Sequence, residues 1–218
     1  MSPRRLYEEE LKQLQESVEE MGMGVRATYA RLFSALQQQK ESVIEEIIAS
    51  DQSTHTLQRR IEGSCLNLIT KQQPIARDLR QVSASLKVVT DISRIGDQCS
   101  DIAELVKRMH FKDLQEFSAH IPQMIEETGK QLTEAINAFV DRNAESAQHV
   151  VTGDDTVDDL FNQVKNDVIA HLRSEAKDPD DCIDVMMFAK YLEKIGDHAV
   201  NIATVSYTHL TLPTKLEV

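Results

Sequence analysis

The sequence predicts an all-α protein built as two tandem three-helix bundles, six helices that arose by internal duplication. Only 7 Gly, 5 Pro and no Trp occur among 218 residues, and runs of Glu, Gln, Lys, Leu and Ala are long. This composition favours helix. Apolar residues recur at steps of three and four through most of the chain. The stretch SRIGDQCSDIA at 93–103 returns as EKIGDHAVNIA at 193–203, which indicates a duplication.

The first repeat, residues 4–110, contains three predicted helices. The first carries a sustained heptad seam, which is typical of a long helix with near-parallel neighbours, and it ends near the weak turn signal at 37–42. The second ends before Pro74, because proline cannot continue a helix. The third has the clearest apolar stripe and runs to about Met109.

The second repeat, residues 112–204, is expected to follow the same three-helix plan. One helix is predicted over 114–140, with a proline in its first turns or at a kink. Helical patterns flank VTGDD at 151–155, where the helix is either broken or continuous like its counterpart. After the break at AKDPDD, Asp180 or Asp181 is the expected N-cap of the last helix.

The end of the chain departs from this plan. After Ala203 the apolar stripe stops in mid-helix, and the residues that follow are rich in Thr and β-branched side chains. We interpret residues 205–218 as a non-native tail of cloning or sequencing origin and exclude them from the fold prediction. A genuine tail without regular structure is the alternative.

The charge balance restricts the partners of the chain. With 24 Lys and Arg against 36 Asp and Glu, the formal charge is -12, which argues against a nucleic acid or an anionic membrane surface as direct partner. The 3 Cys form no CxxC pair and suggest a reducing compartment. No apolar run approaches the roughly 20 residues of a membrane span. We therefore expect a cytoplasmic protein that binds cations or basic protein surfaces.

Each copy of the repeated stretch carries polar residues four apart, on the side of the helix opposite the apolar stripe. Carboxylates at this spacing repel one another unless something neutralises them. Their oxygen atoms suit a hard or borderline metal ion, while a solvated polar face is the alternative. The first copy has Ser93, Asp97 and Asp101, and the second has Glu193, Asp197 and Asn201.

A glycine lies beside the acidic residues in both copies, Gly96 in the first and Gly196 in the second. Each glycine costs about 1 kcal/mol relative to alanine in a helix interior. The usual reason for this cost is the close approach of a neighbouring helix or ligand. We therefore predict that both glycines allow close packing next to the polar residues.

Other motifs carry weaker signals. Asp51 and His55 form an acid and histidine pair four residues apart, which usually is a simple surface pair. Asp51 corresponds to Asp154 in the second repeat, where the four acids of DDTVDD are interpreted as helix N-terminal charge. His198 is more typical of helix packing than of metal ligation. No HExxH, GxSxG or phosphate-binding glycine loop occurs, so we expect no enzyme.

Taken together, these motifs resemble the PhoU family of bacterial phosphate transport regulators. The resemblance covers about residues 4–204 and rests on the doubled IGDxxx(D/N)IA pattern, the QQPIARDLR stretch at 72–80 and the YEEELKQLQESVEEMG opening. It implies two three-helix bundles, multinuclear metal clusters on E(D)xxxD motifs and a homodimer. The metal would be iron, zinc, manganese or magnesium.

The resemblance also implies which residues hold the metal. The second copy matches the family pattern at Glu193, Asp197 and Asn201, whereas the first keeps Asp97 and Asp101. In the first copy a serine replaces the usual acid, so that site would hold metal more weakly or hold fewer ions.

The resemblance implies a regulatory function. The protein would act as a negative regulator of the phosphate-starvation response that couples components of the Pst phosphate ABC transporter to a PhoR-like sensor histidine kinase and restrains uptake. It would reach the membrane only through these partners. Two other readings are a metal-dependent hydrolase or oxidase, which needs ligands converging from several helices, and a plain helical scaffold.

Overall fold

Three long helices form the first half of the molecule. The computed structural model describes residues 3–109, 111–153, 155–174 and 177–211, and no strand is present among them. The turn at 38–40 and the break at Pro74 lie where the sequence predicts them, with Gln73 in the left-handed region at φ 46°. The three helices are α1 (Pro3–Gln37), α2 (Glu41–Gln72) and α3 (Ala76–Val106).

The second half repeats the three-helix plan of the first, but its helices are interrupted more often. The helix predicted over 114–140 is divided, because the chain turns at Ser118, whose hydroxyl accepts a hydrogen bond from the His120 amide, and Pro122 lies in the first turn of the helix that follows. The helix around VTGDD is broken at Gly153. The elements are α4 (Phe111–Phe117), α5 (Ile121–Asp141), α6 (Ala144–Thr152), α7 (Asp155–Ser174) and α8 (Pro179–Val205).

The start of α8 corrects one prediction. Asp178 is the N-cap, since its side chain accepts a hydrogen bond of 2.9 Å from the amide of Asp180. Pro179 follows it, and a proline fits the first helical position because that residue needs no amide donor. The prediction of Asp180 or Asp181 is wrong because it placed the helix start after the proline.

The helical course continues beyond Ala203. A π-helical segment, η1 (Ser206–Thr211), follows α8, and the hydroxyl of the buried Ser206 donates a hydrogen bond of 2.9 Å to the carbonyl of Ile202. Residues 212–218 of the segment predicted to be non-native lie outside the described residues. The foreign origin of 205–218 stays a prediction.

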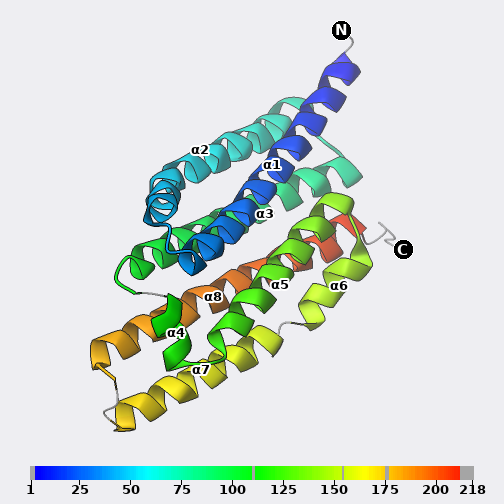
Figure 1. Ribbon diagram of the computed structural model, residues 1–218. Coiled ribbons are helices and arrows are strands. Elements are labelled where there is room, and N and C mark those ends of the chain that lie inside the picture. The colour runs from blue at the N-terminus through cyan, green and yellow to red at the C-terminus, as the bar shows by residue number, and fades with distance from the viewer. Residues whose placement is uncertain (1–2, 110, 154, 175–176, 212–218) are drawn as a thin grey trace.

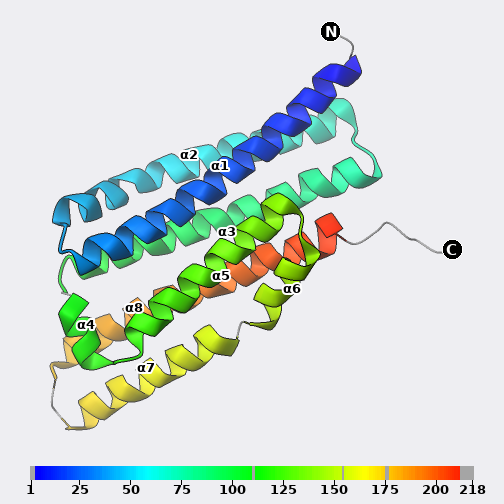
Figure 2. The same ribbon diagram turned by 45° about the vertical axis from the view of Figure 1, so that its right-hand side comes forward.

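The two halves meet along α3 and α8. Figures 1 and 2 show α1, α2 and α3 on one side, α5 to α8 on the other, and the antiparallel pair α3 and α8 at the boundary. The apolar stripes predicted for both repeats are buried, so both halves contribute to one continuous core. The buried positions include Ile92, Ile95, Cys99 and Ile102 of α3 and Ile195, Ala199 and Ile202 of α8.

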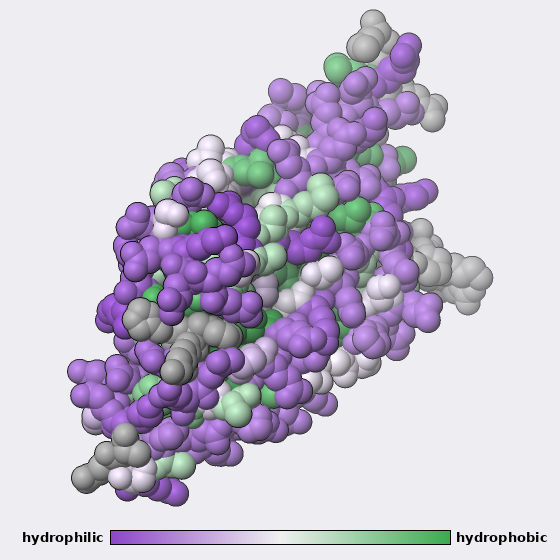
Figure 3. Space-filling view, viewed as in Figure 1, coloured by the Kyte–Doolittle hydropathy of each residue, from purple (hydrophilic) through white to green (hydrophobic). Residues whose placement is uncertain are grey.

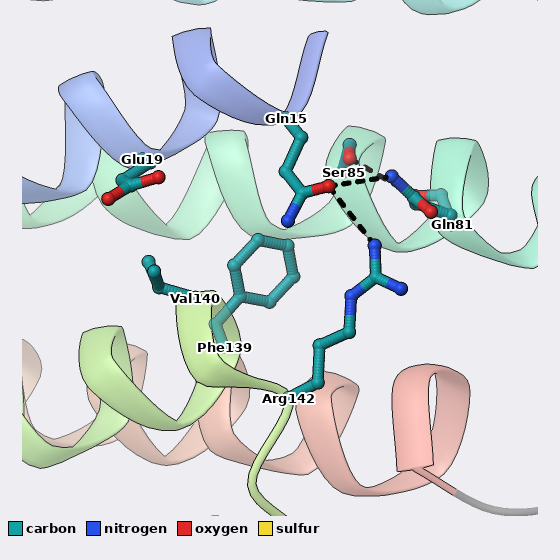
Figure 4. Close-up of a pocket in the computed structure, with 7 residues that line it drawn as sticks. All are labelled: Gln15, Glu19, Gln81, Ser85, Phe139, Val140 and Arg142. Atoms are coloured by element: carbon teal, nitrogen blue, oxygen red, sulfur yellow. Dashed lines mark hydrogen bonds between the residues drawn. The ribbon is translucent and has the colours of Figure 1, made fainter. Parts of the chain in front are cut away.

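A polar joint also links the halves at the end of α5. Arg142, the C-cap of α5 with φ 52°, donates a hydrogen bond of 3.1 Å to Oε1 of Gln15 on α1 (Figure 4). Gln81 of α3 donates to the same oxygen at 3.4 Å. Phe139 and Arg142 help to line a narrow hollow at this point. Its polar lining consists mainly of side-chain amides and a guanidinium group, and it contains no cluster of acidic residues. We interpret it as a structural contact.

The surface is mostly polar. On the face seen in Figure 3, hydrophilic residues dominate and hydrophobic ones show chiefly as small separate patches. Within the described residues, no helix combines the length and the hydrophobicity needed to cross a bilayer.

Candidate metal centre

Close packing at Gly196 brings α7 against α8. A Cβ atom at Gly196 would lie 2.9 Å from Oε1 of Gln131 on α5 and 3.4 Å from Cγ1 of Val157 on α7. In the first half, a Cβ at Gly96 would lie 3.3 Å from Cγ2 of Thr54 on α2. Because glycine leaves this space open, the acidic residue that follows Val157 reaches the polar side of α8.

Three carboxylates converge beside Gly196. Asp158 of α7 joins Glu193 and Asp197 of α8, and one ligand oxygen from each lies within 4.8 Å of the other two. The side chain of Glu193 is only 13% exposed, and its Oε2 is buried without a hydrogen-bond partner. A buried carboxylate oxygen is costly unless a cation compensates it, and the ammonium of Lys194 lies 3.4 Å from this one. We call this cluster the second-half site.

Two lysines accompany the second-half site. Lys190 Nζ lies 2.6 Å from Oε1 of Glu193, and it also lies 5.3 Å from the centre of the Phe161 ring. Lys194 binds Asp197 directly and lies 3.4 Å from Oε2 of Glu193. The hydrogen bond to Asp197 raises the pKa of Lys194. These ammonium groups partly neutralise the carboxylates in the protein alone.

The corresponding position in the first half has different chemistry. His55 of α2 lies between two residues of α3, with Nδ1 hydrogen-bonded to Ser93 Oγ at 3.2 Å and Nε2 3.1 Å from Asp97 Oδ1. Arg94 donates a hydrogen bond of 3.1 Å to Oδ2 of Asp97. One imidazole, one hydroxyl and one carboxylate therefore meet here, and we call this cluster the first-half site.

The last polar residue of each repeated stretch, Asp101 in the first and Asn201 in the second, lies toward the other half of the molecule. Asn201 donates a hydrogen bond of 3.2 Å to Oδ1 of Asp91 on α3, which also lies 2.9 Å from Nδ1 of His198. Burial, and then the charge of Asp101, raises the pKa of Tyr191 on α8. Asp101 and Asn201 thus lie at the contact between α3 and α8, and neither belongs to the three converging carboxylates.

The first polar residue of each repeated stretch, Ser93 on α3 and Glu193 on α8, is less exposed to solvent than the helical periodicity predicts. Ser93 is 2% exposed and Glu193 largely buried, so the prediction that these polar residues face away from the core is wrong at their first position. The reason is that α3 contacts α1, α2 and α8, which leaves only a narrow free sector. His198 packs between the halves, as the sequence indicates.

Sequence reasoning did not select two of the residues that complete these sites. The spacing of Asp51 and His55 predicts only a surface pair, and the DDTVDD stretch that contains Asp158 predicts only helix N-terminal charge. The alignment of Asp51 with Asp154 also makes His55 and Asp158 equivalent positions of the two repeats, and this correspondence could have identified both residues. It was missed because ligands on a neighbouring helix do not belong to the repeated motif itself.

The chain is similar to a known family in both halves. The family model described as PhoU domain matches residues 18–106 and 121–205. The phosphate-specific transport system accessory protein PhoU homolog of Clostridium acetobutylicum is 30% identical over 200 residues, which cover 91% of each chain. PhoU homolog 1 of Methanothermobacter thermautotrophicus is 29% identical over 209 residues, which cover 92% of each chain.

Two crystal structures share the fold. The phosphate transport system regulatory protein PhoU from Streptococcus pneumoniae superposes with a TM-score of 0.83 at 23% identity, covering 92% of this chain and 94% of the other. PhoU from Pseudomonas aeruginosa gives the same TM-score at 24% identity, covering 92% and 96%. The duplicated helical architecture therefore recurs in solved proteins.

Proposed function

The chain belongs to the PhoU family, and from this membership we propose that it serves as an accessory protein in the regulation of phosphate transport. Its relatives are named as accessory or regulatory proteins of phosphate transport systems, and the chain is accordingly not an enzyme. The observation that carries the proposal is the double match to the family model, which covers both halves.

We propose further that the protein acts through contacts with other proteins. It would bind components of the phosphate-specific ABC transporter, link them to a PhoR-like sensor histidine kinase and lower kinase output when phosphate is plentiful. A formal charge of -12 on long, largely polar helices suits docking to basic protein surfaces. Homodimerisation in the cytoplasm is part of this proposal, and light scattering on the purified chain would test it.

Metal binding is the second part of the proposal. Asp158, Glu193 and Asp197 supply three carboxylates from two helices, and the side chain of Glu193 is only 13% exposed. This donor set fits a hard or borderline ion such as magnesium, manganese or iron, and zinc also accepts carboxylate. Bound metal would neutralise the carboxylates and join α7 to α8. Asp97, Asp101 and Asn201 stay predictions as ligands.

The metal proposal is tested with two adjacent aspartates. Asp158→Asn removes one converging carboxylate, whereas Asp159→Asn makes the same charge change on an exposed neighbour outside the cluster. Metal content would be measured on protein purified without chelator. We expect retained iron, zinc or manganese in the wild type and in Asp159→Asn, and a clear loss in Asp158→Asn. Equal metal content in all three proteins would contradict the assignment of the site.

The regulatory proposal is tested in the host. Deletion of the gene should raise alkaline phosphatase activity in medium with high phosphate, because kinase output would no longer be lowered. Re-expression of the wild-type chain should restore repression. Phosphatase that stays repressed after deletion, in a host without a second copy of the gene, would show that the chain has no such role.

A further inference from the structure

Two lysines of α8 contact the carboxylate oxygens that a metal ion would use at the second-half site. Lys190 Nζ lies 2.6 Å from Oε1 of Glu193. Lys194 Nζ lies 3.4 Å from Oε2 of Glu193 and also binds Oδ2 of Asp197. Three of the four carboxylate oxygens of these two acids therefore have an ammonium contact in the protein alone.

The lysines reach these acids along the helix that carries both. Glu193 follows Lys190 by three residues, and residues at this spacing are neighbours on a helix surface. Asp197 follows Lys194 in the same way. The side chains of the two lysines are 41% and 42% exposed, whereas that of Glu193 is 13% exposed. The long lysine stems can therefore turn their ammonium groups toward solvent while the largely buried carboxylate stays in place.

A metal ion and the two ammonium groups compete for the same oxygens. Carboxylate oxygens accept N–H donors and bind metal ions through the same lone pairs. A divalent ion held by Asp158, Glu193 and Asp197 would also repel an ammonium group at this short range, because both carry positive charge. Metal binding at this site would therefore drive the lysine side chains away from the carboxylates.

We propose that Lys190 and Lys194 are competing counterions of the second-half site. Without metal they pair with Glu193 and Asp197 and reduce the repulsion between these carboxylates. When metal binds, both ammonium groups leave the carboxylates and turn toward solvent. This inference rests on the metal binding proposed above and specifies what the ion displaces. The charge that this part of α8 presents to other proteins then depends on metal supply.

Amine labelling of the full chain tests the displacement. Protein treated with EDTA, and the same protein with added Mn²⁺, is labelled briefly with acetic anhydride, and acetylation of each lysine is measured by mass spectrometry. We expect acetylation of Lys190 and Lys194 to rise about twofold to fivefold with Mn²⁺, as the loss of partly exposed ion pairs allows. The control is Lys130, which forms the same kind of contact with Glu126 and Glu127 of α5 and should be labelled equally in both samples.

The outcomes of the labelling separate the two proposals. Equilibrium dialysis of the same protein measures bound Mn²⁺. Bound Mn²⁺ with unchanged acetylation of Lys190 and Lys194 would overturn the displacement and leave metal binding established. No bound Mn²⁺ would overturn metal binding itself, and the displacement with it.

Lysine variants provide the reciprocal test. Lys194→Met removes a competing charge and keeps a side chain of similar length, so the dissociation constant for Mn²⁺ should fall about twofold to fivefold relative to the wild type. Lys130→Met makes the same charge change away from the site and should bind Mn²⁺ as the wild type does. A dissociation constant that is unchanged or raised in Lys194→Met would refute competition between this lysine and the metal.

Discussion

Gly196 sets how closely α5 and α7 approach the acidic part of α8. The space that a Cβ would need is already taken by Gln131 and Val157, and Gln131 is itself buried. A methyl group at this position would first displace the end of the Gln131 side chain, because the contact with Val157, at 3.4 Å, is an ordinary van der Waals distance. The glycine thus lets α5 and α7 pack closely beside the acidic part of α8.

We expect Gly196→Ala to lower the free energy of unfolding relative to Gly63→Ala by about 1–3 kcal/mol, as overpacked core substitutions do. At Gly63 a Cβ meets nothing within 4 Å, so alanine there should stabilise α2 by about 0.5–1 kcal/mol through its higher helix propensity. Urea denaturation measures both. Equal stability of the two variants would mean that the approach at Gly196 is not tight.

The buried thiols make stability depend on alkaline pH. Burial raises the pKa of the Cys99 thiol from 9.0 to about 12. Below pH 9 the thiol is protonated in both states, but between pH 9 and 12 only the unfolded chain loses its proton. The free energy of unfolding should therefore fall as pH rises through this range. In Cys99→Ala the free energy of unfolding, measured by denaturant titration, should fall less steeply between pH 9 and 12. The same pH dependence in the variant and the wild type would show that the Cys99 thiol is not its source.

The sequence predicted the acids of α8 but not the residues of other helices that lie beside them. Glu193 and Asp197 share one helix, so helical periodicity alone places them together. Asp158 and His55 come from other helices, and their distance to the motif depends on tertiary packing. Only the comparison of the two repeats carries information about them, because duplicated positions keep equivalent places.

Helix ends decide where the second half differs from the first. α2 runs unbroken from Glu41 to Gln72, whereas its counterpart is divided into α6 and α7 at Gly153. Asn143 caps α6 by accepting hydrogen bonds from two amides, and Gly153 ends it. The division starts a new helix just before the acids that include Asp158, which places negative charge at its positive end.

The N-cap of α8 can be tested by substitution. Asp178→Ala should lower the free energy of unfolding by about 1 kcal/mol, because the Asp180 amide loses its acceptor. Asp178→Asn keeps a side-chain oxygen and should lose little. Thermal or urea unfolding of both variants checks this, and equal losses in the two would indicate that charge at the helix start matters more than the hydrogen bond.

Element boundaries were predictable where turn chemistry is local. The turn near 38–40 and the end of α2 before Pro74 follow from residues at the site of the break. The division between α4 and α5 was predicted only in part. Pro122 indicates an irregularity, but the hydrogen bond from the His120 amide to the Ser118 hydroxyl forms only once the chain has turned there. At α8 the proline itself marks the start, and the residue before it is the cap.

Contacts between the halves join the two repeats into one molecule. Asp91 near one end of the α3–α8 contact binds Asn201, and Asp101 lies near Tyr191 at the other end. Asp91 and Tyr191 occupy equivalent positions in the two repeats, and so do Asp101 and Asn201. Each residue therefore lies near the residue at the other position in the partner repeat, as expected for an antiparallel pair of duplicated helices. The polar residue at the end of each motif therefore faces the partner repeat. The sequence predicted the duplication but not the face on which the repeats meet.

Asn201→Asp separates an interface role from metal ligation. As an interface residue, the new carboxylate would lie beside Asp91, lose the donated hydrogen bond and lower the free energy of unfolding by about 0.5–1 kcal/mol. Metal content would stay unchanged. If Asn201 is a ligand, as the sequence predicts, the added charge should raise metal content. Stability and metal analysis of the same preparation distinguish the two outcomes.

If the proposed function is correct, the chain represses phosphate-responsive gene expression and needs the three converging carboxylates of α7 and α8 to do so. Alkaline phosphatase activity in high phosphate, measured in a deletion strain that expresses variants from a plasmid, separates the possible outcomes. The wild type and Asp159→Asn should restore repression, and Asp158→Asn should not, at equal protein levels. Full repression by Asp158→Asn would show that the carboxylate cluster is not needed for regulation, and failure of the wild type to repress would show that the chain does not regulate this response.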